Sequence, residues 1–198
     1  MKGIVFTEFL DFVGAKLGPD LLDDIIDDAA LPNGGAYTAV GTYPYQEMGA
    51  LVGALSRRTE TAVPLLLTRF GNHLCKRFAE KFPEFFETHA CLFDFLASVD
   101  NHVHVEVLKL YPDAELPTFR LIPRDERTID FEYESCRPLE ALAEGLIVAA
   151  ADYYGEPITL ERTRIDEPGR AFVRFSIRLA AGKAAGNAVR KTADITAA

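Results

Sequence analysis

Two histidines stand two positions apart in SVDNHVHVEVLKLYPDAELP, residues 98–117, and are the first candidates for metal chemistry. On a β-strand, His102, His104 and Glu106 would project from one face and could hold a metal ion together. On a helix, residues two apart point in nearly opposite directions, so only one histidine could enter a given pocket. From this segment alone, a metal-binding pair, one ligating histidine and two ordinary surface histidines all remain open.

The residues around the histidines favour the helix. Apolar residues recur there every three or four positions, although HVHVEV taken alone alternates like a strand, and the run is too long for a typical strand. These apolar residues are Leu92, Leu96, Val99, Val103 and Leu110.

A second group of polar residues lies in FEYESCRPLEALAEG, residues 131–145. Tyr133, Ser135 and Arg137 follow one another at two-residue intervals where a strand is expected to end, so their side chains should share one face. Two hydroxyl groups and a guanidinium before a helix N-terminus suit an anionic group, and arginine can bind a carboxylate or phosphate through two hydrogen bonds. The alternative is three polar residues on the solvent face of a sheet.

The elements that must position these residues predict an α+β protein. Up to about residue 111 the apolar spacing is helical, with a Gly- and Pro-rich loop at 31–45. After Pro117 the period changes to that of antiparallel strands, with one strong helix inserted between two pairs of strands. The expected helices are 2–17, 18–31, 46–57, 62–81 and 88–111, and the inserted helix has Pro138 in its first turn and ends before Gly155. The expected strands lie at 118–125, 127–135, 157–165 and 170–180.

Composition narrows the class of protein. The 198 residues are 48% hydrophobic and suit one domain over residues 1–180, whereas 181–198 has too little apolar mass to pack and is predicted to be a flexible tail. A net charge of −9 argues against nucleic-acid binding. The chain shows neither a membrane span nor a signal peptide, and three cysteines without CxxC spacing suggest reduced cytoplasmic thiols. The cysteines are Cys75, Cys91 and Cys136.

The two polar segments together resemble the haem nitric-oxide/oxygen binding (H-NOX) family, of the stand-alone bacterial type. The Y-x-S-x-R pattern of Tyr133, Ser135 and Arg137 is similar to the family signature, and residues 98–117 are similar to its iron-ligand segment. The opening MKGIVFTEFL and the run PLEALAEGLIVAAADYY are also similar, so the resemblance covers about residues 1–180.

This resemblance implies an H-NOX fold with one haem b buried between the helical N-terminal part and the four-stranded sheet. Tyr133, Ser135 and Arg137 would hold the haem propionates, His104 would be the proximal iron ligand, and Pro117, thirteen residues on, would contact the haem. His102 would then point away from the iron. Family members that carry zinc use cysteines late in the chain, and none follows Cys136, so we expect no zinc.

The resemblance also implies which gas is bound. Members that bind dioxygen stably carry a distal tyrosine five residues after the signature arginine, and this chain has Leu142 there. Bound dioxygen needs a hydrogen-bond donor in a dry pocket, and nitric oxide needs it far less. We therefore expect binding of nitric oxide and CO with exclusion of O2. The candidates for the apolar distal wall are Ile4, Leu74, Leu142 and Leu146.

Signalling should pass to a separate protein, because the chain has no GxxxxGK[ST], GxGxxG or catalytic triad pattern. In the family, nitric oxide weakens the bond between iron and the proximal histidine, and bacterial relatives pair with a histidine kinase or a cyclic-di-GMP enzyme. We expect a cytoplasmic sensor, not an enzyme. The alternatives are an O2-binding haem protein, a peroxidase-like one using His73, and a non-haem module that binds an anionic small molecule through Arg137.

Overall fold

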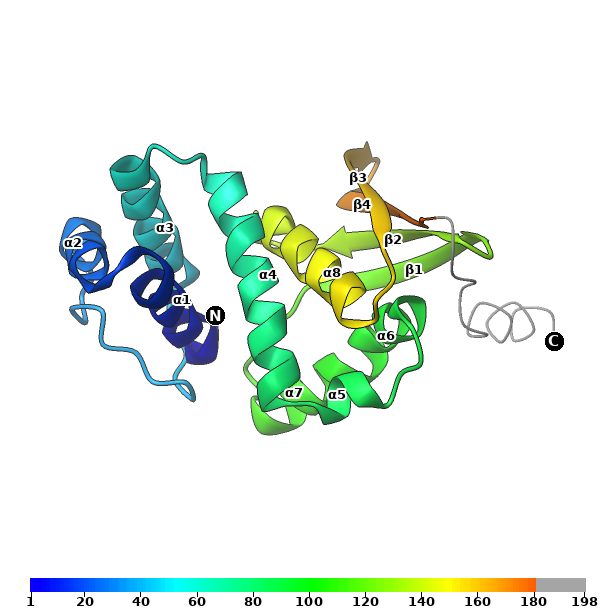
Figure 1. Ribbon diagram of the computed structural model, residues 1–198, viewed down its shortest axis with the longest axis horizontal. Helices are drawn as coiled ribbons and strands as arrows, with labels where there is room; N and C mark the ends of the chain where they lie inside the picture. The colour runs from blue at the N-terminus through cyan, green and yellow to red at the C-terminus, as the bar shows by residue number, and fades with distance from the viewer. Residues whose placement is uncertain (181–198) are drawn as a thin grey trace. The chain divides into compact units, whose positions relative to one another are not determined.

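The computed structural model describes residues 1–180, so the predicted tail at 181–198 lies outside the described residues. The chain folds into two compact units. The N-terminal unit comprises Met1–Arg77 and Ala141–Leu146, and the sheet unit comprises Phe78–Glu140 and the chain from Ile147 onward. Figure 1 shows the order of the elements along the chain. The prediction of one domain over residues 1–180 stays a prediction.

The N-terminal unit is helical because aromatic and aliphatic residues recur on one side of each helix. It contains α1 (Gly3–Leu17), α2 (Pro19–Ala29), α3 (Tyr45–Thr59) and most of α4 (Val63–Lys81). The rings of Phe9 and Phe70 meet edge to face with centroids 5.1 Å apart, which packs α1 against α4. The largest fully buried side chains of this unit are Phe6, Phe9, Phe70, Ile25, Leu51 and Leu55.

Two glycines let α4 approach the inserted helix α8 (Glu140–Tyr153) closely. A Cβ atom on Gly71 would lie 2.2 Å from the backbone oxygen of Leu142, and one on Gly145 would lie 2.0 Å from that of Thr68. Both distances are far below van der Waals contact, so any larger residue at either position would force the two helices apart.

The sheet unit begins with short helical pieces and continues into the sheet. The pieces are α5 (Glu84–Glu87), α6 (Leu92–Ser98), the π-helical turn η1 (Val99–Val103) and α7 (His104–Leu110). The strands β1 (Thr118–Asp125), β2 (Thr128–Glu134), β3 (Ile158–Glu167) and β4 (Arg170–Leu179) form one sheet in the order β1-β2-β4-β3. All neighbouring strands are antiparallel.

The alternation of residues along β2 gives the sheet one apolar face and one charged face. Ile129, Phe131 and Tyr133 are buried on the apolar face, where the Phe131 ring stacks on Phe119 of β1 with centroids 4.6 Å apart. Asp130 and Glu132 point to the other face and are nevertheless only 4% and 3% exposed.

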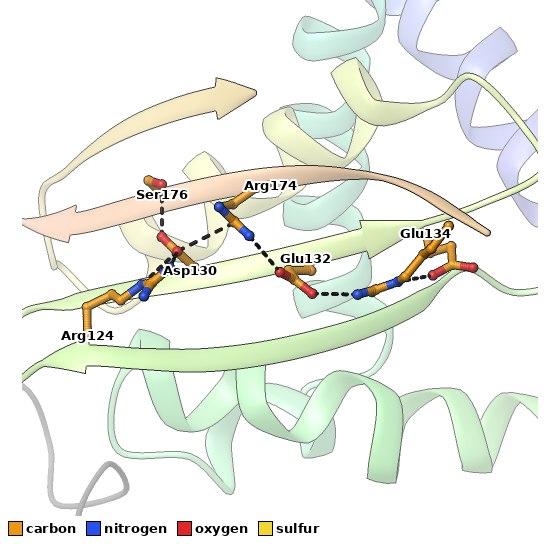
Figure 2. A network of polar contacts seen from close by, with 7 residues as sticks. Arg124, Asp130, Glu132, Glu134, Arg174 and Ser176 are labelled. Carbon is orange, nitrogen blue, oxygen red and sulfur yellow. Dashed lines mark hydrogen bonds and ion pairs between the residues drawn. The ribbon is translucent and has the colours of Figure 1, made fainter. Parts of the chain in front are cut away.

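Figure 2 shows the network that satisfies these two carboxylates. Asp130 accepts hydrogen bonds from Arg124 of β1 and, at 2.9 Å, from the Ser176 hydroxyl of β4. Glu132 accepts from Arg170 at 3.0 Å and from Arg174 at 3.1 Å. Buried charges are tolerated when they are paired and hydrogen-bonded in this way.

The predicted fold class is confirmed: helices combine with a four-stranded antiparallel sheet and one inserted helix. The expected helix over 88–111 begins at Leu92 and is interrupted by η1. The helix expected to have Pro138 in its first turn begins at Glu140, because the amide of Leu139 bonds back to the carbonyl of Arg137 at 2.9 Å and keeps the chain in a tight turn. Within residues 1–180, no helix combines the length and apolarity needed to span a membrane.

Candidate functional site

His104 is the first residue of α7, directly after the π-helical turn, and its side chain is 15% exposed. Burial lowers the pKa of this imidazole, and a hydrogen bond with Asp100 opposes the shift. The ring is therefore neutral at pH 7. Its Nδ1 lies 3.2 Å from the Oδ1 atom of Asp100, which suits an Nδ1–H donor and leaves the Nε2 lone pair for a metal ion.

His102 does not join His104 in one site. It belongs to η1, is exposed, and its ring approaches Phe85 edge-on with centroids 5.9 Å apart. The His104 ring instead lies 5.6 Å from the ring of Phe119 on β1. Because both histidines lie in helical turns, the strand-borne metal pair does not form. In the described residues 1–180, no three His, Cys, Asp or Glu side chains gather to hold a metal ion.

Tyr133, Ser135 and Arg137 lie at and just beyond the end of β2. Burial raises the pKa of the Tyr133 hydroxyl, and a hydrogen bond with the Ser135 side chain opposes this shift. The Ser135 hydroxyl oxygen also accepts a bond from the backbone N–H of Arg137 at 3.1 Å. The structure therefore brings the two hydroxyl groups and the arginine together.

Arg137 already holds a carboxylate. Its side chain is 10% exposed, donates to the carbonyl oxygen of Glu115 at 3.0 Å, and forms an ion pair with the Glu115 carboxylate. Glu115 itself is 73% exposed and lies two residues before Pro117, in the segment between α7 and β1. The Arg137 side chain is therefore placed to bind a carboxylate group.

Pro117 directly precedes β1 and is half-buried. Phe119, two residues further on, is the residue whose ring lies next to His104. The sheet unit therefore contains His104, Pro117 and the Y-x-S-x-R residues.

The four predicted distal-wall residues all belong to the N-terminal unit. Leu74 on α4 is 2% exposed, and Leu142 and Leu146 lie four residues apart on α8, both half-buried like Ile4 on α1. None of the four brings a side-chain hydrogen-bond donor.

His73, the residue considered for a peroxidase-like distal pair, has a different neighbour. Its Nε2 atom is 3.9 Å from a carboxylate oxygen of Glu8, which is fully buried and also binds Arg77 at 3.1 Å. Burial lowers the pKa of His73. His73 and Arg77 thus converge on a buried carboxylate of α1.

The sequence analysis did not predict the hydrogen-bonding partners of His104 and Arg137, which are Asp100 and Glu115. Asp100 could have been found, because residues four apart on a helix are neighbours. Glu115 lies 22 residues from Arg137, and no local pattern links them.

Comparison with known proteins shows the family and the fold. The family model described as Haem-NO-binding matches residues 2–162. The unliganded ferrous H-NOX protein from K. algicida is 35% identical, with a TM-score of 0.85 over 92% of this chain and 98% of that one. A point mutant of the same protein is 36% identical, with a TM-score of 0.84 over 91% of this chain and 97% of that one.

A more distant solved structure shares the fold. The ferrous NO-bound H-NOX protein from S. oneidensis is 23% identical, with a TM-score of 0.83 over 91% of this chain and 99% of that one. A search of curated proteins gave no match.

Proposed function

The chain belongs to the haem-NO-binding, or H-NOX, family of haem-based gas sensors, and we propose that it senses nitric oxide and excludes dioxygen. We propose one haem b as its cofactor, held with its iron on His104 and its propionates on Tyr133, Ser135 and Arg137. The signal would pass to a separate protein when His104 leaves the iron.

The grip of Arg137 on a carboxylate is the observation that carries this proposal. A haem is an apolar disc with two carboxylates on one edge, so its protein site needs a cationic clamp, an apolar enclosure and an axial nitrogen. Arg137 supplies the clamp, and the neutral imidazole of His104 lies in the same unit.

The residues have separate tasks in this proposal. When bound, haem would supply a ferrous iron able to bind a diatomic gas. His104 would donate its Nε2 lone pair to the iron, while its Nδ1–H would remain hydrogen-bonded to the Asp100 carboxylate. Pro117 would contact the haem. Ile4, Leu74, Leu142 and Leu146 form the apolar wall on the gas side and keep water out.

We infer the choice of gas from the lack of a hydrogen-bond donor among these four side chains. Bound dioxygen is partly negative at its outer atom, and without a donor a dry apolar wall gives it no compensation. Leu142 stands where a tyrosine hydroxyl would be needed, so nitric oxide and CO bind and dioxygen does not. The hydroxyl oxygen of Tyr43, in the loop before α3, accepts a hydrogen bond from the Thr38 amide at 2.9 Å.

Loss of the His104 bond is the proposed switch. His104 is the first residue of α7, so its release from the iron frees the start of that helix to shift. The partner would be a histidine kinase or a cyclic-di-GMP enzyme in the cytoplasm of a bacterium, and the chain itself would not be an enzyme. No membrane or nucleic acid would take part.

The absorption spectrum of the purified full-length protein tests this proposal. It should be recorded after reduction by dithionite and then after separate exposure to air, CO and nitric oxide. A Soret band that shifts with nitric oxide and CO but not with air supports the proposal. A stable oxy form would make this an O2-binding protein, and no haem band even after haem is added would leave a non-haem anion site at Arg137.

A further inference from the structure

Asp100 is the polar neighbour of His104, the candidate iron ligand. Its Oδ1 atom lies 3.2 Å from Nδ1 of His104, within hydrogen-bonding distance. The His104 side chain is 15% exposed and the Asp100 side chain 35%, so the imidazole is largely shielded from water and the carboxylate is partly exposed. A hydrogen bond to an ionised acceptor is stronger than one between neutral groups.

The backbone fixes this pair. The amide of His104 bonds to the carbonyl of Val99, five residues back, which is the π-helical pattern of η1. Asp100 and His104 are four residues apart across this turn, so their side chains project from the same side. The carboxylate therefore meets the imidazole without help from a distant part of the chain.

A carboxylate hydrogen-bonded to Nδ1 changes the properties of Nε2 as a metal ligand. It fixes the tautomer with the proton on Nδ1, sets the ring orientation, and makes Nε2 a more basic ligand. All three effects favour the iron-bound state of His104. In a sensor whose signal is the loss of this bond, they also set how readily the signal is given.

We propose that Asp100 is a positioning residue that strengthens the bond between His104 and iron and so sets the fraction of gas-bound protein in which His104 is released. This inference rests on the proposed function, because it concerns the same haem. The hydrogen bond also lies within one helical segment, so it stays intact when His104 leaves the iron. Asp100 then keeps the ring oriented for rebinding.

The test compares Asp100→Asn with Glu106→Gln. Asparagine has nearly the size of aspartate and keeps an acceptor oxygen, but loses the charge. Glu106 lies two residues after His104, and its carboxylate pairs with Lys109, so Glu106→Gln removes one negative charge nearby without touching the imidazole. Asp100→Ala is a second variant that removes the acceptor altogether.

Resonance Raman spectra of the reduced, gas-free proteins measure the bond directly. The iron–histidine stretching band should move to lower frequency in Asp100→Asn and further in Asp100→Ala, and the reduction potential should rise in the same order. With nitric oxide, conversion to the five-coordinate form should be about tenfold faster, the usual size of such outer-sphere effects. Glu106→Gln should match the wild type in all three measurements.

Nitrogen NMR of the haem-free proteins provides a readout independent of iron. The His104 ring should be a single Nδ1–H tautomer in the wild type and a mixture in Asp100→Ala. If haem binds but the Asp100 variants behave like Glu106→Gln, the inference is wrong and the proposed function stands. If no haem binds, the proposed function fails, and a single tautomer in Asp100→Ala would overturn the inference as well.

Discussion

Different interactions stabilise the inside of each of the two units. The N-terminal unit relies on close apolar packing, with helices so near that only glycine fits at Gly71 and Gly145. The sheet unit keeps its functional residues in place through hydrogen bonds and ion pairs, at His104, at Arg137 and across the charged face of the sheet. A substitution in the N-terminal unit should therefore act mainly through packing, and one in the sheet unit mainly through a lost hydrogen bond or charge.

The largest effect should come from His104→Gly in the sheet unit. Removing the imidazole leaves the proposed haem iron without its protein ligand, so the spectrum of the reduced protein should change completely. Added imidazole should restore it by occupying the space left behind. His102→Gly is the control, and an equal loss in that variant would mean that the ligand has been misassigned.

The next effect should come from Gly145→Ala in the N-terminal unit. The new methyl group would meet a backbone oxygen that no side-chain rotation can move, so the free energy of unfolding should fall by about 3 kcal/mol. Gly49→Ala, on α3 with nothing within 4 Å of its added Cβ, should instead raise it by about 0.5–1 kcal/mol. Urea unfolding of both variants measures the difference, and equal midpoints would contradict the close helix crossing.

A smaller change should follow from Leu142→Tyr, which adds a polar group to the apolar unit. A new hydrogen bond of about 1.4 kcal/mol would prolong an oxygen complex about tenfold. Oxygen dissociation after flash photolysis measures this lifetime. Leu142→Phe is the matched control without the hydroxyl, and equal behaviour of the two variants would show that position 142 does not face the bound gas.

The smallest effect concerns the charged face of the sheet and its dependence on pH. Burial alone would raise the pKa of Glu132, but hydrogen bonds from Arg174 and Arg170 outweigh burial and leave the pKa below its ordinary value of 4.5. Because the folded state binds fewer protons than the unfolded state, this stabilisation is complete above pH 4.5 and is lost as the pH falls below it. Thermal melting of wild type and Glu132→Gln between pH 7 and pH 3 should show a shallower decline for the variant.

Much of the fold was predictable because the period of the apolar residues reports local geometry. The helices over 45–59 and 63–81 were located within about two residues, and the four strands were recognised by their alternation. The π turn was not predicted, because five residues of η1 have the same apolar spacing as an α-helix. The late start of α8 was also missed, because it depends on a turn formed by Arg137 and Leu139.

The candidate site was less predictable from the residues alone. HVHVEV alternates like a strand, and only the longer window and the family resemblance singled out His104. The ion pair between Arg137 and Glu115 joins positions far apart in the chain, so it depends on the fold. The roles of the site residues towards haem stay predictions, to be decided by the spectra.

The π turn has one further consequence, which concerns the phase of the helix. The segment from Leu92 to Leu110 carries one more residue in η1 than an uninterrupted α-helical ladder would hold. If all the five-residue bonds of η1 became four-residue bonds, the one from His104 to Val99 included, α7 would rotate by about 100° and advance by about 1.5 Å relative to α6. The conversion of this one π turn into α-helix is thus equivalent to a screw motion of all the residues of α7.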